Sequence, residues 1–528
     1  MRFHAIVWIS SLVLMLWTIA FAPVQRTQEA RVLESAREMT DSASAGDGWR
    51  GWMIPRANGI VRLQKPPLAY WMSAGSFKMF GVTDWAGRLP FALCGWLTIL
   101  LTYHMALREF ASIRAAVCSA GLLAGSFLFH RHARMAETDI VLTLMLTIAI
   151  HSIWRGFDPG ARRRILWFQL SGIAIGLACI AKGPPAMFPI LFLTAMTLIT
   201  RRWRVALQWF ISGAPLIAAI IGAPWWIYAR SLPQGSAVAR ELNVLLDEPN
   251  HPGWFFVYFP YLLKAMLPWS PIAFVALIDA SLNWRRDPQI HVRLTPPLAW
   301  CGSILVPLFF LGNKQEHYLL PMLPPLALIA GWWIDRATRV EQTHPARAIG
   351  RLIVIITSVV LAICALALPL AAQRLRGDII TTDLVIAIVL LLAATIVVLL
   401  TKRNLAAGLT AFSIAGAICL SAIIGFWWPT TETQSPRTVA AQIRAIGPGP
   451  YCFFGENFSL PLVYNLRSIV PQARNARELT QLMSDHPNLL IIAQTKSKVA
   501  PPPVPIGCET VGEIFMKDQK FEIYRSIQ

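Results

Sequence analysis

The chain has 528 residues, of which 55% are hydrophobic and only 14% are charged. Ordinary soluble domains carry about 25% charged residues, so this composition excludes a cytosolic globular enzyme. The chain also holds 21 Trp residues and many apolar runs, which indicate a polytopic membrane protein because about 20 apolar residues span the hydrocarbon core as a helix. Much of the net charge of +19 lies in short turns between the apolar runs, where it sets topology and meets lipid headgroups rather than nucleic acid.

Thirteen apolar runs follow one another along the chain. The count is approximate, because only Lys182 and Gly183 separate the fifth run from the sixth, and Pro260 and Pro268 interrupt the eighth. We therefore predict an α-helical membrane protein with about 13 transmembrane helices. The runs lie at about residues 4–22, 89–106, 115–129, 140–154, 165–181, 184–200, 207–228, 256–278, 298–311, 317–334, 352–372, 382–400 and 405–428.

The short loops predict the orientation, because Lys and Arg accumulate on the cytoplasmic side during insertion. One alternate set of loops is clearly basic, which places this set and the N-terminus in the cytoplasm and, with an odd number of spans, the C-terminus outside. The expected location is the inner (plasma) membrane. The basic set comprises Arg108 and Arg114, Arg155 and Arg162 to Arg164, Arg201, Arg202 and Arg204, Arg285, Arg286 and Arg293, Arg336, Arg339, Arg347 and Arg351, and Lys402 and Arg403.

The first apolar run has a second interpretation as a cleaved signal peptide. Arg2 supplies the charged end, and the small residues at Ala20 and Ala22 resemble a cleavage site. Residue 23 lies outside in either case, so the rest of the predicted topology does not depend on this choice.

Two parts of the predicted external side are larger than turns. Residues 23–88 are polar at first and amphipathic from Trp49 to Phe80, as expected of helices at the membrane interface. Residues 429–528 alternate β-like and helical patterns, which predicts a small α/β domain. We expect a transmembrane domain at 1–428, including the loop 23–88, and an extracytoplasmic α/β domain at 429–528. A disulfide between Cys452 and Cys508 is left open.

Polar side chains gather at the predicted outer ends of the spans, where their burial is costly and a site is expected. They offer cations for a phosphate, carboxylates for a base, and a His for a metal or a hydrogen bond. The alternative is that a single Lys or His there anchors a helix at the interface, and that Glu34, Arg37 and Glu38 form a solvated helix face. The gathered set comprises Gln28 to Arg31, Lys65, Glu137, Asp139, Lys182, His251, and Lys314 to Tyr318.

An ordered set of short strings resembles a known family. The chain is similar to the polyprenyl-phosphate-dependent glycosyltransferases, which include the protein O-mannosyltransferases and the lipid A aminoarabinose transferases. The resemblance covers about residues 23–334. Beyond them, only the arrangement of the remaining spans and the tail agrees with the family. The strings are Glu-x-Arg and Arg-Glu-Met near residue 30, KPPLAYW from Lys65, WAGRLP from Trp85, AKGP around Lys182, PWW from Pro224, His251-Pro, LPWS from Leu267, and HYLLP from His317.

The resemblance implies a membrane fold of the GT-C type with an external active site. It implies an inverting transfer of a sugar from a polyprenyl phosphate donor to a lipid A, glycan or protein acceptor, without a nucleotide. By position, Arg31 and Lys65 would bind the donor phosphate, with Lys182, Lys314 and Tyr318 as further candidates. Glu29 and Asp139 would be the candidate catalytic carboxylates, and His251 a candidate metal ligand.

Two positions depart from the family pattern, because Gln28 and Gln64 stand where the family carries carboxylates. The loop then supplies only Glu29 as a base, and a metal loses an acidic ligand, so a divalent metal stays an open alternative. An inactive paralogue is a second interpretation. A transporter or flippase is a third, although charges near the bilayer midplane and an internal repeat, which are typical of transporters, are not seen in the sequence.

Overall fold

The computed structural model describes residues 2–17, 19–44, 48–236, 254–341, 344–431, 434–496, 506–516 and 519–527. The chain packs as two compact units. The first comprises Met1–Ile19, Leu63–Ala69 and Arg88–Trp427, and the second comprises Ala20–Arg62, Tyr70–Gly87 and Trp428–Gln528.

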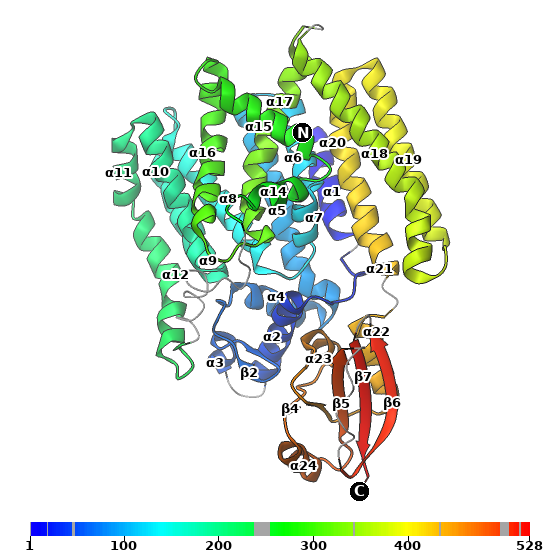
Figure 1. Cartoon of the computed structure of the whole chain (residues 1–528). Coiled ribbons are helices and arrows are strands. Elements are labelled where there is room, and N and C mark those ends of the chain that lie inside the picture. The colour runs from blue at the N-terminus through cyan, green and yellow to red at the C-terminus, as the bar shows by residue number, and fades with distance from the viewer. Residues whose placement is uncertain are drawn as a thin grey trace. The chain divides into compact units, whose positions relative to one another are not determined.

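Helices make up almost all of the described first unit, where they pack side by side (Figure 1). The apolar runs of the sequence form them, since a backbone in lipid must satisfy its own hydrogen bonds. In chain order they are α1 (Arg2–Leu16), α5 (Asp84–Phe110, from Arg88 in this unit), α6 (Ile113–Ala124), α7 (Phe127–His132), α8 (Thr138–Phe157), α9 (Arg164–Ala181), η1 (Pro184–Met187), α10 (Phe188–Thr200), α11 (Trp203–Ile211), α12 (Ala214–Ser231), α14 (Tyr258–Ala265), α15 (Ser270–Asn283), α16 (Pro288–Phe310), η2 (Glu316–Met322), α17 (Leu323–Arg339), α18 (Pro345–Arg376), α19 (Thr381–Arg403), α20 (Leu405–Ala422) and η3 (Ile423–Trp427).

The described helices confirm a multi-pass membrane architecture. Eight of them are long and apolar enough to cross a membrane, or nine if α11 and α12, which meet at a bend of 49°, form one span. Gly213 lies at this bend with φ 84, a conformation that glycine adopts without steric cost. Shorter apolar helices occupy four more of the predicted runs. Each of the 13 predicted runs therefore contains helix, but only eight or nine of the described helices have the length of a span.

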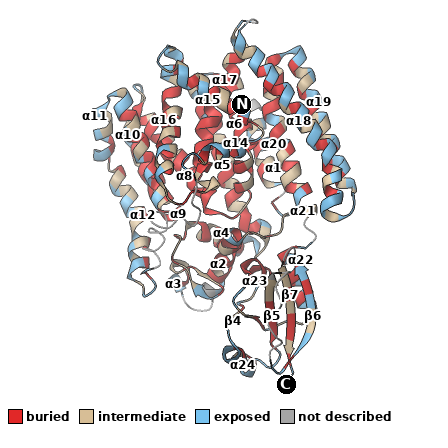
Figure 2. Ribbon diagram, in the orientation of Figure 1, coloured by how far each residue is buried: buried red, intermediate tan, exposed pale blue. Residues whose placement is uncertain are grey.

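Burial separates the core helices of this unit from those on its periphery (Figure 2). The span that contains α17 is 89% buried over its apolar window, whereas α18 is only 22% buried although it is more apolar. An apolar helix that exposes most of its surface is expected to face lipid. We infer that α17 and α8 form the centre of the unit and that α18 and α19 face hydrocarbon.

The basic loops of the first unit contact one another. Arg108, near the end of α5, forms an ion pair with Asp158 just after α8. Arg336, near the end of α17, lies 2.8 Å from Asp287 just before α16. Arg293 Nη1, near the start of α16, donates to the Phe110 carbonyl at the end of α5 at 3.0 Å and so links the two pairs. These basic helix ends therefore lie together on one face of the helical unit.

The second unit contains a five-stranded sheet with the order β4-β3-β5-β7-β6. Strand β3 pairs in parallel with β4 and β5, and β7 pairs antiparallel with β5 and β6. This sheet with its helices confirms the predicted α/β character of the tail. The elements of the unit are α2 (Thr27–Ser44), α3 (Gly48–Met53), β1 (Arg56–Ala57), β2 (Ile60–Val61), α4 (Leu68–Phe80, from Tyr70 in this unit), α21 (Trp428–Thr430), α22 (Pro436–Ile446), β3 (Tyr451–Phe454), α23 (Leu460–Leu466), β4 (Gln472–Ala473), α24 (Ala476–Asp485), β5 (Leu490–Lys496), β6 (Cys508–Met516) and β7 (Gln519–Ser526).

Most of the segment 23–88 packs with the tail, which differs from the predicted division at residues 428 and 429. The Asn58 side chain joins the two parts, because its Nδ2 donates to the Val470 carbonyl and its Oδ1 accepts from the Val470 amide, both at 2.7 Å. Helix α2 also packs against α23. Cys452 and Cys508 are both free, so the disulfide that was left open is not formed.

The expectation of a solvated charged face on α2 was wrong. Glu34, Arg37 and Glu38 are all buried, because α3, β1 and α23 pack against this helix. The charges of Glu34 and Arg37 are paired within the helix, with Arg37 Nη2 at 2.6 Å from Glu34 Oε1 and Arg37 Nη1 at 2.7 Å from Asp41 Oδ2. Glu38 Oε2 accepts a hydrogen bond from the Gly59 amide at 3.0 Å.

The buried Glu38 predicts a pH-dependent stability. Burial, and then the neighbouring Glu34 carboxylate, raise the pKa of Glu38 to about 7. Its unfolded pKa is about 4.3, so the protonated carboxyl stabilises the fold below that pH, and this contribution is lost as the pH rises through about 7. Glu38→Gln keeps the neutral form at every pH. We expect it to raise the melting temperature of the full-length protein in detergent more at pH 8 than at pH 5.

The matched control is Asp41→Asn, which removes a carboxylate that also pairs with Arg37 but whose side chain is 61% exposed. This variant should change the melting temperature by a similar small amount at both pH values. If Glu38→Gln also shifts it equally at both, Glu38 does not titrate in this range.

Candidate functional site

A cavity in the first unit lies where several helices end or begin. Asp139 is in the first turn of α8, Lys182 follows the last residue of α9, and Tyr318 lies in η2 before α17. Lys65 lies in the extended segment before α4. These four residues and Gln64 and His317 make up the polar part of the lining. The cavity therefore gathers residues from four parts of the chain.

The rest of the cavity lining is apolar, and we call it the apolar wall. It is built mainly by Pro184 and Phe188 around the start of α10, by Trp226 of α12, and by Leu308 and Leu311 at the end of α16. A cavity that combines cations with an apolar lining suits an amphipathic ligand with an anionic head.

The Ala-Lys-Gly-Pro string gives the cavity its local shape. Gly183 ends the α9 turn with φ 84, and a Cβ at this position would lie 2.7 Å from the Trp226 ring. Only glycine allows this conformation and this close approach together. Pro184 then starts the short helix η1, because proline fits the first position of a helix. The turn leaves the Lys182 side chain at the cavity wall.

A buried ion pair joins Lys182 to Asp139 Oδ1. His317 Nε2 lies 4.0 Å from the same oxygen, and Lys182 Nζ lies 5.0 Å from the centre of the Tyr318 ring. The ammonium group is thus held between a carboxylate and an aromatic face, where cation–π attraction adds to the ion pair. A carboxylate that is paired with a buried lysine is a weak proton acceptor, because protonating it breaks the pair.

The structure places some of the predicted site residues on the lining of one cavity. Lys65, Asp139, Lys182 and Tyr318 line the same cavity. Lys314 is not part of this lining, since its Nζ donates to the Leu311 carbonyl at 2.5 Å.

The remaining predicted residues are not part of the lining of this cavity. Glu29, which is buried, and Arg31, which is half-buried, are in the first turns of α2 in the second unit. His251 lies outside the described residues.

Gln64 lies on the cavity lining at one of the two positions where the family pattern has a carboxylate. Its Oε1 is buried and has no hydrogen-bond partner in the described part of the chain. An unsatisfied buried amide oxygen is unusual in a finished site, and a bound ligand with a hydroxyl or amine donor would satisfy it.

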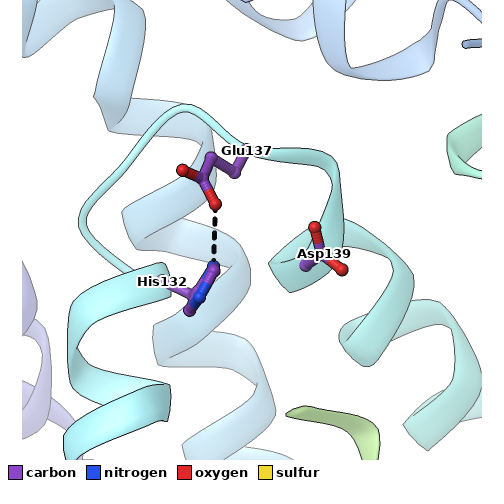
Figure 3. Close-up of side chains that lie close together, drawn as sticks. All are labelled: His132, Glu137 and Asp139. Atoms are coloured by element: carbon purple, nitrogen blue, oxygen red, sulfur yellow. Dashed lines mark ion pairs between the residues drawn. The ribbon is translucent and has the colours of Figure 1, made fainter. Parts of the chain in front are cut away.

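A cluster of potential metal ligands adjoins the cavity and was not predicted. His132, Glu137 and Asp139 each offer one ligand atom, and these atoms lie within 4.8 Å of one another (Figure 3). All three residues are buried. In the sequence these residues form the pattern His-x4-Glu-x-Asp, of which only the two carboxylates were expected at the site. His317 lies in the expected stretch Lys314 to Tyr318, but no role was predicted for it.

Comparison with known sequences identifies relatives over part of the chain. Residues 64–228 match the sequence model of the family described as dolichyl-phosphate-mannose-protein mannosyltransferase. An uncharacterised protein of Aquifex aeolicus is 26% identical over 342 residues, which are 63% of this chain and 64% of that protein. The undecaprenyl phosphate-alpha-4-amino-4-deoxy-L-arabinose arabinosyl transferase of Pseudomonas paraeruginosa is 30% identical over 314 residues, which are 57% of this chain and 55% of the enzyme. The chain thus matches less than two thirds of the length of these relatives.

Comparison with solved structures extends the similarity to the whole chain. The crystal structure of ArnT from Cupriavidus metallidurans bound to undecaprenyl phosphate aligns with a TM-score of 0.77 over 98% of this chain and 97% of ArnT, at 20% sequence identity. At this identity the alignment shows a shared fold, which is the GT-C type that the motifs implied. The sequence match and the shared fold therefore confirm the resemblance of this chain to the GT-C superfamily that contains the protein mannosyltransferases and the aminoarabinose transferases.

Proposed function

We propose that the chain is a membrane glycosyltransferase that moves a sugar from a polyprenyl phosphate donor to a lipid A, glycan or protein acceptor. The observation that carries the proposal is the cavity whose lining combines Lys65 and Lys182 with many apolar side chains. The cations suit a phosphate, and the wall suits the first isoprene units of a lipid. The names of the relatives support this donor class, since the name of the Pseudomonas enzyme contains a sugar linked to undecaprenyl phosphate.

The reaction is an inverting displacement at the anomeric carbon. The acceptor oxygen forms a bond to that carbon, the bond from the carbon to the phosphate oxygen breaks, and the phosphate leaves with the electron pair. The acceptor proton passes to a carboxylate. Lys65 and Lys182 stabilise the charge that grows on the leaving phosphate, and fixed charges act most strongly at such a point because they need no reorganisation. Arg31 is a further phosphate ligand by its family position.

Glu29 is the better candidate for the base. Asp139 is held by Lys182, so its carboxylate positions that ammonium group and is poorly suited to accept a proton. Glu29 is a buried carboxylate in the first turn of α2 and keeps the acidic position of the family loop next to Gln28.

The proposed orientation has the N-terminus in the cytoplasm of the inner (plasma) membrane and the C-terminal unit outside. The contacts between the basic helix ends support it, because a single face then carries the cations that the positive-inside rule assigns to the cytoplasm. The cavity residues lie at the other ends of α8 and α17, which would put the reaction on the external side.

One observation favours a second candidate, an inactive paralogue that binds the lipid donor without transferring the sugar. Gln64 occupies a cavity position where the family pattern has a carboxylate. An assay that follows both sugar transfer and release of polyprenyl phosphate separates the candidates. An active transferase produces both, whereas an inactive paralogue or a transporter releases no polyprenyl phosphate.

Donor binding is tested by Lys65→Ala and Arg31→Ala. Each variant removes a charged hydrogen bond to the phosphate, which is worth about 1.5 to 3 kcal/mol, so we expect roughly a ten- to hundredfold loss of donor affinity. The measurement is binding and transfer with a labelled polyprenyl-phosphate sugar in detergent. The control is Lys402→Ala, which removes a cation near the end of α19. Donor affinity within about twofold of wild type in both test variants would rule out the phosphate assignment.

The base assignment is tested by Glu29→Gln, which keeps the shape of the side chain and removes its charge. We expect turnover to fall by about 10² or more with little change in donor affinity, because the base acts on the acceptor hydroxyl in the transition state. Gln28→Asp is the opposite control and should preserve or raise turnover. If Glu29→Gln and Asp139→Asn both turn over like wild type, acid–base catalysis by these residues is wrong.

The orientation is tested by reporter fusions after Gln528. A reporter that is active only outside the cytoplasm should be active there, and one that requires the cytoplasm should not. The control is a fusion after Arg403 at the end of α19, which should give the opposite result. If the reporter that requires the cytoplasm is active after Gln528, the orientation of the chain is the opposite of the proposed one.

A further inference from the structure

We propose that His132, Glu137 and Asp139 form a binding site for a divalent transition metal such as Zn²⁺, which binds both imidazole and carboxylate ligands. This site differs from the His251 position that the family resemblance suggested. Metal binding here does not depend on the proposed transferase function, although the consequence for Lys182 that is drawn below rests on it.

The spacing of the three ligand atoms suits a single ion. They lie within 4.8 Å of one another. Zn–N and Zn–O bonds are about 2.0 to 2.2 Å long, so two ligands of one tetrahedral ion lie roughly 3.5 Å apart. Binding of one ion therefore requires the most distant of these atoms to approach one another by roughly 1 Å.

The contact between His132 and Glu137 is close but is not aligned as a hydrogen bond. His132 Nδ1 lies 2.9 Å from Glu137 Oε2, and the His132 side chain is only 2% exposed. Nevertheless, this nitrogen makes no hydrogen bond in the described part of the chain. A buried polar atom without a hydrogen bond calls for an explanation, and a bound ion is one that fits a nitrogen beside a carboxylate oxygen. Figure 3 shows the two side chains approaching each other, with Asp139 beside them.

A short stretch of chain holds the three residues in place. His132 is the last residue of α7, Glu137 is the N-cap of α8, and Asp139 is in the first turn of that helix. Between them, the Glu137 amide donates to the Met135 carbonyl at 2.9 Å and the Arg134 amide to the Arg131 carbonyl at 3.3 Å. Ligands fixed by two helix ends and a hydrogen-bonded turn lose little entropy when a metal binds.

Asp139 connects this cluster to the cavity. Lys182 forms its ion pair with Asp139 Oδ1. The carboxylate has a second oxygen, and this is the atom that a metal can bind. A metal bound to Asp139 draws electron density away from the carboxylate. The ion pair between this carboxylate and the Lys182 ammonium group then becomes weaker. Under the proposed function, Lys182 is then freer to bind the donor phosphate, so the metal and the donor should favour each other's binding.

The test uses the full-length protein in detergent, stripped with a chelator and then titrated with Zn²⁺ in the absence of any sugar donor. Bound zinc is measured by elemental analysis and by calorimetry. We expect one zinc per chain in the wild type and at least about a tenfold loss of affinity in both His132→Gln and Glu137→Gln. The matched control is His130→Gln, a buried imidazole on the same helix that contacts Ser421 and Arg134 and should leave zinc binding unchanged.

A second readout covers the case in which a variant does not fold. Co²⁺ bound to the wild-type protein should give the visible absorption of a four-coordinate site, and added Zn²⁺ should remove it. Zinc binding that persists in His132→Gln and is lost in His251→Gln would overturn the proposal, as would the absence of any zinc or cobalt binding by the wild type. The zinc titration contains no donor, so its result does not depend on the proposed function. A wild-type protein that binds zinc but shows no transferase activity in a separate assay would contradict the proposed function alone.

Discussion

The buried ion pair between Lys182 and Asp139 is the interaction on which the cavity depends. Removing charges from water inside a helical membrane unit costs several kcal/mol per ion, and pairing them recovers much of that cost. The pair also joins the end of α9 to the start of α8, the two helices with the most extensive mutual packing in the unit. Breaking it by removing one partner is expected to cost about 3 to 5 kcal/mol, so substitutions at either residue affect folding as well as any chemistry.

The sequence predicted the helical architecture and part of the site because both follow from local rules. A long apolar run must become a helix in lipid. A polar residue at the end of such a run is costly to bury, so it is expected to be paired or to take part in a functional site. Lys65, Asp139, Lys182 and Tyr318 were found by that reasoning together with the family strings, and they line one cavity. Lys314 satisfied the same rule, but its ammonium group binds a nearby carbonyl instead.

Features that depend on distant parts of the chain were not predictable in this way. The burial of Glu38 comes from β1 and α23 packing on α2, and the Asn58 contact that helps to hold this arrangement reaches Val470 across more than 400 residues. Hydropathy places segments in or out of lipid but does not say which external segments fold together. His132 was missed for a different reason, because the closeness of its ring to Glu137 depends on the conformation of a turn.

The apolar wall around Phe188, Trp226 and Leu308 has a kinetic consequence. Under the proposed function, a lipid donor that binds against this wall keeps its chain in hydrocarbon, so the protein meets it by two-dimensional diffusion. The relevant concentration is then the mole fraction of donor in the bilayer, rather than its concentration in the bulk sample. Adding inert lipid at a constant amount of donor would slow the reaction by surface dilution. The polyprenyl phosphate product would leave by lateral diffusion into the same leaflet.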